Sequence, residues 1–398
     1  MNILTGVTVL DVTNVLAGPF AGYLLALLGA ETIKIEHPKG GDLARKLGAS
    51  PELNNKAMGT SFLAQNANKK SIGINLKMPE GKEIFKKLVK NADVVLENFR
   101  PDVMDKLGLG YEVLREIKED IIYCGISGFG RNGPLAKNPA YDQIIQGKSG
   151  LMDITGTPES GPLRVGAPIT DTVGGLTAVM AILGALYFRS TTGKGQMIDV
   201  ALLDSILPMM GWVLSNYLIA GQKPVRMGNE NFTAAPSGAF QAKDGLLNIS
   251  ANKDEQWQEL CRILDLEELV TDPRFAERDT RKKNRHELSK ILNERLKEKT
   301  AEEWEAILNA RGIPSGTVNT LEKALHQPQI LHRGLLKKIR DEDLGDITVC
   351  GLAPKFSAIS QEPLNAPPTL GEHTDEIMRN LGYGDETIRD YKRKGVIA

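Results

Sequence analysis

The first third of the chain alternates short apolar runs with segments in which apolar residues recur every three or four positions. Short apolar runs predict strands, and the three-to-four-residue period predicts amphipathic helices. Strands are expected at residues 7–12, 31–36, 93–96 and 120–126, with a further strand-like run after residue 68, and helices at 19–28, 79–91 and 111–117. Because strands separated by helices form right-handed βαβ units, this order predicts an α/β fold with a mainly parallel sheet.

The middle of the chain is more apolar and then breaks. Residues 176–188 predict a buried core helix, which Gly193 and Gly195 should end, and residues 196–200 resume a strand pattern. Residues 201–218 predict one long apolar helix. The Gly-, Asn- and Pro-rich residues 221–236 then indicate a domain boundary.

The pattern changes again after this boundary. Residues 239–241 and 246–250 flank Lys243-Asp-Gly245, which predicts a hairpin. Charged amphipathic helices follow, with one apolar stripe at Trp257, Cys261 and Leu264 and a capping box from Thr300 to Glu303. A strand at 347–350 and a last helix opened by 367–374 resemble the first third. We therefore expect a large domain of residues 1–200 and 325–398, a small α+β domain of residues 225–315, and linkers at 201–224 and 316–324.

Composition excludes several classes of protein. The 398 residues carry 49 Lys and Arg against 50 Asp and Glu, whereas a nucleic-acid binder needs a basic face. The three cysteines form no CxxC and the five histidines no HExxH, so we expect reduced thiols and no metal site. No signal-peptide pattern is found, and the longest apolar stretch, 173–188, is shorter than the ~20 residues of a membrane span. A cytoplasmic protein without a membrane partner is expected.

One motif indicates a nicotinamide dehydrogenase but lacks the context for it. Residues 128–133 satisfy G-x-G-x-x-G after a predicted strand. That fingerprint must open a helix, whereas Pro134 and Pro139 prolong a loop here. Glu36 mimics a ribose-binding acid at the end of the second strand, although a surface acid is the commoner case there.

Asp142 lies between a proline-bounded loop and a helix-like run. An acidic residue there ordinarily stabilises the helix dipole by ~0.3–1 kcal/mol. The alternative is a covalent nucleophile beneath a Gly-rich loop.

Cations also follow the predicted strands: Lys34, His37, Lys39, Arg45, Lys77, Arg100 and Lys106. Ligands of open α/β sheets lie beyond the carboxyl ends of the strands, so these cations predict a polyanionic ligand.

These motifs, in this order and over almost the whole chain, resemble the class III coenzyme A transferases, the superfamily of formyl-CoA transferase and carnitine CoA-transferase. The matching segments are residues 16–19, 29–36, 41–42, 68–71, 97–101, 128–134, 141–142, 192–199, 272–275, 312–314 and 370–374.

The resemblance implies a Rossmann-like large domain built from both chain ends, a small α+β domain, and an interlocked homodimer. It implies transfer of CoA from an acyl-CoA to a small carboxylic acid, with CoA as substrate and no permanently bound cofactor, which removes the dehydrogenase. Asp142 matches the family's nucleophile, which forms an aspartyl anhydride and then an aspartyl-CoA thioester. The backbone amides near Leu16 and Ala17 would face the thioester. The matched CoA positions are Val15, Phe99, His37, Ile74, Lys77, Asn98, Arg100 and Lys106.

Some positions depart from the family pattern. Leu16 replaces a glutamine and Ser127 a lysine of formyl-CoA transferase, which argues against oxalate as acceptor. His37 replaces an arginine, and residues 228–236 carry one glycine in place of a glycine run. The racemases of the superfamily use a His where Tyr141 stands, together with an Asp that matches Asp171. A racemase, an intramolecular CoA-transfer isomerase and a non-catalytic acyl-CoA-binding protein are the alternative functions.

Overall fold

The computed structural model describes residues 2–359 and 363–398, and the chain divides into two compact units. The first unit comprises the chain up to Leu151, Arg164–Lys223 and His332–Ala398. The second comprises Met152–Leu163 and Pro224–Leu331. Most of residues 201–224, which we expected to form a linker, belongs to the first unit.

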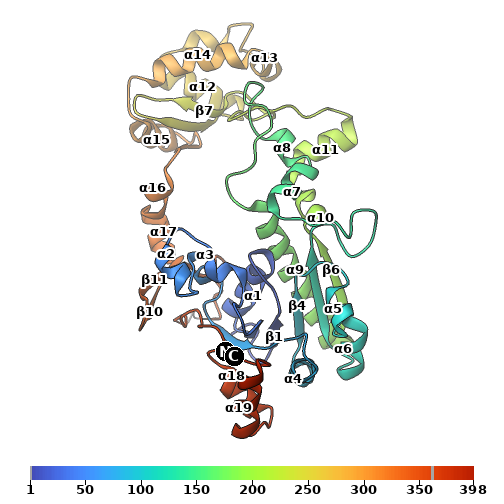
Figure 1. Cartoon of the computed structure of the whole chain (residues 1–398). Helices are drawn as coiled ribbons and strands as arrows, with labels where there is room; N and C mark the ends of the chain where they lie inside the picture. The colour runs from blue at the N-terminus through green and yellow to red at the C-terminus, as the bar shows by residue number, and fades with distance from the viewer. Residues whose placement is uncertain (1, 360–362) are drawn as a thin grey trace. The chain divides into compact units, whose positions relative to one another are not determined.

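The first unit is built on a six-stranded parallel sheet, so the expected α/β class is confirmed (Figure 1). The strand order is β3-β2-β1-β4-β5-β6. The order reverses between β1 and β4, and ligands of open α/β sheets bind at such a switch point. The strands are β1 (Thr8–Asp11), β2 (Glu31–Glu36), β3 (Lys69–Gly73), β4 (Val94–Glu97), β5 (Ile122–Ser127) and β6 (Gln196–Ala201).

Helices cover both faces of this sheet. One face packs against α1 (Ala17–Leu27) and α9 (Ile169–Thr192), through side chains such as Leu25 and Ile182. The other face packs against α4 (Pro79–Val89), α6 (Tyr111–Ile117), α18 (Thr374–Asn380) and α19 (Asp385–Lys394). Ile74 also pairs with Ile397, so the C-terminal segment lies beside the end of β3.

Shorter elements complete this unit. A two-stranded antiparallel sheet pairs β10 (Leu336–Asp341) with β11 (Gly345–Cys350). The other helices are η1 (Leu43–Lys46), α2 (Pro51–Asn55), α3 (Thr60–Leu63), α5 (Val103–Leu107), α7 (Asp142–Lys148), α10 (Leu202–Ile206), η2 (Pro208–Met210) and α11 (Gly211–Ala220). Helices α8 (Leu151–Ile154) and α17 (Pro328–Arg333) cross the limits between the two units.

The prediction of one long helix at residues 201–218 is wrong. The segment breaks into α10, η2 and α11, because Pro208 lacks an N–H and its ring clashes with the preceding turn. Gly211, which opens α11, adopts a φ of 55°. The following helix exposes large apolar side chains, including Trp212 and Ile219.

Helix α9 is longer than predicted and only one of its faces is buried. It ends at Thr192, and Gly193 follows with a φ of 72°, as the sequence suggested. Leu176, Met180 and Tyr187 are exposed. By length and composition alone, Ile169–Thr192 and Leu202–Ala220 are each long and apolar enough to cross a membrane. In α9 the other face packs into the core of the first unit.

The second unit has a core of its own. Its antiparallel sheet has the order β7-β8-β9, and its helices bury Trp257, Leu292 and Trp304. The predicted hairpin is confirmed, since the Ala242 N–H donates to the Gly245 carbonyl at 2.8 Å, and so is the capping box at Thr300. The elements are β7 (Ser237–Gln241), β8 (Leu246–Ser250), β9 (Ser315–Thr317), α12 (Asp254–Ile263), η3 (Glu267–Val270), α13 (Arg278–Lys283), α14 (Arg285–Leu296), α15 (Ala301–Ala310) and α16 (Leu321–Leu325). Residues 228–232, part of the segment 228–236, line a cavity within this unit.

Candidate active site

A cavity of about 270 Å³ opens at the switch point of the parallel sheet. Its walls are the loops that follow β1, β4 and β5, together with residues 136–141 and the start of α9. Six residues that the resemblance assigned to CoA line it: Val15, Leu16, Ala17, Asn98, Phe99 and Arg100. Residues 15–17 and 98–100 are 83 positions apart along the chain, and the reversal of strand order brings them together.

A second cavity of about 200 Å³ shares Asn14 and Phe99 with the first. His37, Ile74 and Lys77 line it, so three more of the assigned residues lie next to the same end of the sheet. His37 and Lys77 are exposed, whereas Ile74 is buried in the core. Lys106 is exposed on α5 and lines neither cavity.

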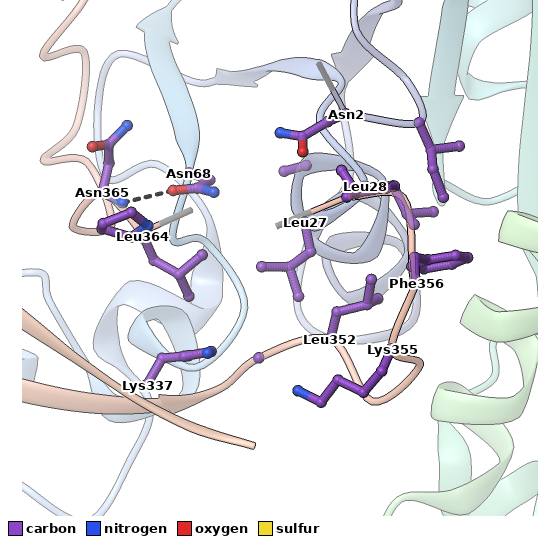
Figure 2. A pocket seen from close by; sticks show the side chains of 15 residues that line it. Asn2, Leu27, Leu28, Asn68, Lys337, Leu352, Lys355, Phe356, Leu364 and Asn365 are labelled. Carbon is purple, nitrogen blue, oxygen red and sulfur yellow. Dashed lines mark hydrogen bonds between the residues drawn. The ribbon is translucent and has the colours of Figure 1, made fainter. Parts of the chain in front are cut away.

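A third cavity, also of about 270 Å³, lies elsewhere in the first unit and contains none of the assigned residues (Figure 2). Figure 2 shows apolar side chains from the end of α1 facing Leu352 and Phe356, with Lys337 and Lys355 nearby. Within residues 2–359 and 363–398, no carboxylate lines this cavity.

Asp142 is the first residue of α7, and its carboxylate is buried and held by several donors. Its Oδ1 accepts hydrogen bonds from the Thr170 N–H and the Thr170 hydroxyl, both at 2.8 Å. Its Oδ2 accepts one from Gln146 Nε2 at 2.8 Å and lies 3.7 Å from Arg164 Nη2. Both oxygens of Asp142 are therefore engaged by neighbouring groups.

The residues beside Asp142 connect it to the cavity at the switch point. Tyr141, which precedes α7, and Asp171, in the first turn of α9, line this cavity, whereas Asp142 itself does not. Burial, and then the charge of Asp142, raise the pKa of Asp171 to about 7. Asp171 is therefore the carboxyl group that lines the cavity, and the buried Asp142 lies close enough to influence its pKa.

The N-terminus of α1 faces the same cavity through Leu16 and Ala17. In the part of the chain that the structure describes, no side chain caps this helix. Among residues 2–359 and 363–398, no acceptor bonds the N–H of Leu16 or of Ala17. The positive end of the helix dipole and free N–H groups together favour a developing negative charge.

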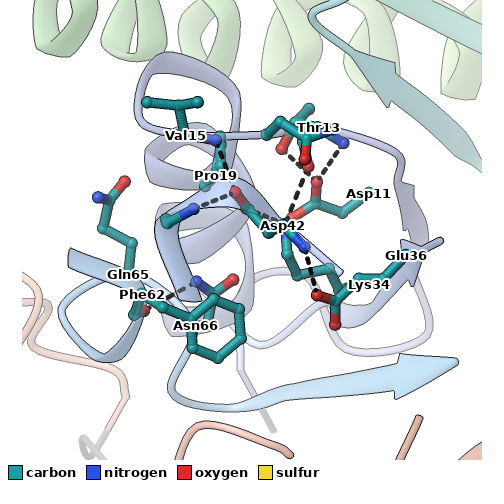
Figure 3. A network of polar contacts seen from close by, with 12 residues as sticks. Asp11, Thr13, Val15, Pro19, Lys34, Glu36, Asp42, Phe62, Gln65 and Asn66 are labelled. Atoms are coloured by element: carbon teal, nitrogen blue, oxygen red, sulfur yellow. Dashed lines mark hydrogen bonds and ion pairs between the residues drawn. The ribbon is translucent and has the colours of Figure 1, made fainter. Parts of the chain in front are cut away.

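Two of the cations after strand ends were misinterpreted, because Lys34 and Arg45 are fully buried and paired with carboxylates. Figure 3 shows Lys34 and Asp42 side by side. Lys34 Nζ lies 2.9 Å from Asp42, and Arg45 Nη2 lies 2.6 Å from Glu36. Glu36 is consequently a buried partner of Arg45 and not the surface acid that we expected. Neither cation is available to a ligand, since a buried charge must keep its partner.

Asn98 lines the cavity, but its side-chain amide is already engaged. Its Oδ1 accepts the Asn14 N–H and its Nδ2 donates to the Asn14 carbonyl, both at 2.8 Å. The amide of Asn98, in the loop after β4, thereby holds the loop after β1 in place.

The groups that hold Asp142 were not predicted from the sequence. Gln146 follows Asp142 by four positions, and this spacing places two side chains on one face of a helix. The contact between Asp142 and Gln146 could therefore have been predicted from the sequence. Thr170 and Arg164 carried no such local signal. The packing of the start of α9 against α7 brings Thr170 to Asp142 across 28 residues.

Known proteins resemble this chain over nearly its full length. The model of CoA-transferase family III matches residues 4–374. The chain belongs to CoA-transferase family III. It is 39% identical to the succinyl-CoA:glutarate CoA-transferase of Homo sapiens, over 99% of this chain and 90% of that protein. It is 41% identical to the acetyl-CoA:oxalate CoA-transferase of Acetobacter aceti, over 84% of this chain and 85% of that protein.

Solved structures agree with this assignment to CoA-transferase family III. The crystal structure of a CAIB/BAIF family protein from Brucella suis superposes with a TM-score of 0.84 at 37% identity, covering 96% of this chain and 100% of that one. The chain is therefore an enzyme of the CoA-transferase class, as the resemblance implied. No group of three or more potential metal ligands occurs in the part of the chain that the structure describes.

Proposed function

We propose that this enzyme moves CoA from an acyl-CoA donor to a short dicarboxylic acid through covalent intermediates on Asp142. The observation that supports this best is the oriented Asp142 carboxylate, held at Oδ1 by Thr170 and at Oδ2 by Gln146, next to the cavity at the switch point. In the proposed reaction Asp142 attacks the thioester carbon and CoA leaves as a thiolate, which forms a mixed anhydride. The thiolate then attacks the aspartyl carbonyl, the donor acid leaves, and an aspartyl-CoA thioester remains. The acceptor carboxylate reverses these steps.

The free N–H groups of Leu16 and Ala17 would stabilise the oxyanion of the tetrahedral intermediates. Donors that are already oriented toward the developing charge lower the barrier without further reorganisation. The cavity that they line also reaches Phe99 and Arg100. The pantetheine chain would run along Val15 and Phe99, toward the second cavity with His37, Ile74 and Lys77.

The proposal of a dicarboxylic acid as acceptor is supported by the named relatives and by one cation of this chain. Glutarate and oxalate, named for the human and Acetobacter proteins, are both dicarboxylates. Arg164 lies 3.7 Å from Asp142 and is partly exposed, so it would hold the carboxylate of the substrate that does not react. We propose succinyl-CoA as donor and glutarate as acceptor, with oxalate as a competing acceptor in the assay.

We further propose that the enzyme is a cytoplasmic homodimer. Support comes from the resemblance and from the large apolar side chains that α9 and α11 expose, such as Met180, Tyr187 and Trp212. Such side chains on a protein surface commonly mark a protein interface. Sedimentation analysis of the purified enzyme should give twice the chain mass of 43.4 kDa.

Trapping the covalent intermediate tests the proposed function. The enzyme is incubated with succinyl-CoA and then with hydroxylamine, which should convert Asp142 to a hydroxamate that peptide mass spectrometry locates. Asp142→Asn should yield no adduct and no CoA transfer to glutarate. Asp346→Asn, at an exposed carboxylate of β11, is the matched control and should behave like the wild type. Full transfer activity in Asp142→Asn would refute the proposed mechanism.

The same purified enzyme can be used to distinguish a racemase from a CoA-transferase. The carboxyl of Asp171 in the cavity, with a pKa of about 7, has the character of a group that moves protons. A racemase would exchange the α-proton of a 2-methylacyl-CoA for deuterium without any acceptor acid. A CoA-transferase needs the acceptor and leaves that proton in place.

A further inference from the structure

The turn between β1 and α1 has a backbone that its own sequence does not favour. Val15 adopts a φ of 70°, in the left-handed region, which is unusual for a β-branched residue. Leu16 follows with φ −134° and ψ −66° and precedes the first turn of α1. Such a conformation persists only where its surroundings hold it, and it is commonest at functional sites.

Asp42 holds this turn from the loop after β2. Its Oδ1 accepts the N–H of Val15 and the N–H of Ala44, both at 2.9 Å. Its Oδ2 lies 2.9 Å from Lys34 Nζ, and both side chains are fully buried (Figure 3). Burial alone would raise the pKa of Asp42, but Lys34 and the two backbone N–H groups outweigh it and lower the pKa below its ordinary value. The carboxylate is therefore charged when it binds Val15.

The same network fixes the residues on either side. Lys34 Nζ also donates to the Thr13 carbonyl at 3.0 Å, and the Thr13 N–H donates to Asp11 Oδ1 at 3.0 Å. Lys69 Nζ lies 2.8 Å from Asp11 Oδ2 and donates to the Pro19 carbonyl at 2.9 Å, which ties the network to the first turn of α1.

Asn98 holds the turn from the opposite side. Its amide makes two hydrogen bonds with the backbone of Asn14, in the manner of a paired strand. Asn14 and Val15 are thus each bound by a side chain from a different neighbouring loop. The next two N–H groups along the chain, those of Leu16 and Ala17, are the free donors that line the cavity.

From this geometry we infer that Asp42 and Asn98 are positioning residues, which hold the β1–α1 turn so that the Leu16 and Ala17 N–H groups face the reacting carbonyl. The inference rests on the proposed function. Neither side chain needs to touch the thioester, because each acts through the backbone of the turn. Shifting a catalytic group by about 1 Å lowers a rate on the order of 10²-fold.

The first test compares Asp42→Ala, Asp42→Asn and Asn98→Ala. Asp42→Ala and Asn98→Ala should lower kcat on the order of 10²-fold, while KM for the acyl-CoA changes by less than about threefold. Asp42→Asn keeps an oxygen that accepts the Val15 N–H, so it should recover a substantial part of the lost kcat. A merely structural role would instead lower the melting temperature and the amount of active enzyme, with kcat per active site unchanged.

The second test changes a residue of the turn itself and leaves the buried charges in place. Val15→Gly adopts the same φ without strain and leaves the turn freer, so kcat should fall while the melting temperature does not. Val15→Ala removes the same side chain but keeps the restricted backbone, so the ratio of the two kcat values isolates the rigidity of the turn. Equal kcat in the two variants, with wild-type kcat in Asn98→Ala, would overturn the inference.

Hydroxamate trapping separates this inference from the proposed function. If the wild-type enzyme yields no hydroxamate adduct at all with succinyl-CoA, the proposed function fails and the inference fails with it. If the adduct lies on Asp171, which lines the same cavity, only the assignment of Asp142 as nucleophile fails. If the wild type is labelled and the Asp42→Ala and Asn98→Ala variants are labelled at the same rate, only the inference fails.

Discussion

The buried pair of Glu36 and Arg45 offers a prediction whose magnitude follows from the structure. Arg45 donates to both oxygens of Glu36, at 2.7 and 2.6 Å, and also to the Pro368 carbonyl at 3.2 Å. Arg45→Met removes these hydrogen bonds. The carboxylate of Glu36, a residue only 4% exposed, then keeps the Ser71 hydroxyl and one backbone N–H as hydrogen-bond donors. Removing one partner of a buried pair costs about 3–5 kcal/mol, out of the ~5–15 kcal/mol that stabilise a folded protein.

A double-mutant cycle measures this coupling. Replacing both charges, in Glu36→Met with Arg45→Met, leaves no unpaired charge and should cost less than Arg45→Met alone. Urea unfolding at pH 7, followed by circular dichroism, gives the four free energies of unfolding. A loss below about 1 kcal/mol in Arg45→Met, or a double variant that simply adds the two single losses, would refute the reasoning.

The pH dependence of the same pair provides an independent check. Burial would raise the pKa of Glu36, but Arg45, together with Lys34 and Ser71, outweighs it, and the pKa lies below the ordinary 4.5. The stability contributed by the ionised Glu36 is therefore present above pH 4.5 and is lost as the pH falls through the lowered pKa. The difference in stability between wild type and Arg45→Met should shrink in that range. A difference that stays constant down to the acid transition would contradict the assignment of charge.

Three further predictions concern the candidate site. Thr170→Val should lower the free energy of unfolding by about 1.5–3 kcal/mol, because it removes a hydroxyl donor from the buried carboxylate of Asp142. In Thr172→Val, where the hydroxyl bonds only the backbone of its own helix, urea unfolding should detect less than about 0.5 kcal/mol. Burial raises the pKa of Glu97 to about 7, so stability should fall as the pH rises from about 4.5 to about 7, and Glu97→Gln should abolish that slope in thermal unfolding. Three exposed cations, Lys77, Arg100 and Lys106, are the candidates for CoA binding. Replacing each with alanine should weaken CoA binding measured by calorimetry, and the loss of affinity should shrink at high salt. Unchanged affinity in all three variants would contradict their assignment to the CoA site.

Much of the fold could be predicted because its elements follow local rules. The limits of β2 and α6 agree with the expected ranges 31–36 and 111–117, since β2 alternates isoleucines with polar residues and α6 is one amphipathic period. The segment after β6 could not be predicted as well. Its apolar residues form a continuous helical pattern, and only Pro208 marks the break that the backbone makes there.

The parts of the candidate site that depend on topology were predictable, and those that depend on packing were not. A parallel sheet requires the loops after β1 and β4 to meet at one end, so Val15 and Arg100 could be expected to line one cavity. No such rule links Asp142 to Thr170, because their contact depends on how α9 packs against α7.

The cations show why a count of charges after strand ends is insufficient. Lys34 lies within β2, in which every residue but the first is buried, so its ammonium group could reach no solvent-borne ligand. A charged residue inside a strand covered on both faces must find an internal partner, and Asp42 follows eight positions later. Lys77 follows the end of β3 and is exposed at a cavity wall. A cation within a buried strand should therefore be interpreted as part of the scaffold that holds the active-site loops, and one beyond the strand end as a candidate for the ligand. By this criterion Asp42 and Lys34 belong to the scaffold of the β1–α1 turn, where a substitution should change the rate before it changes the affinity for CoA.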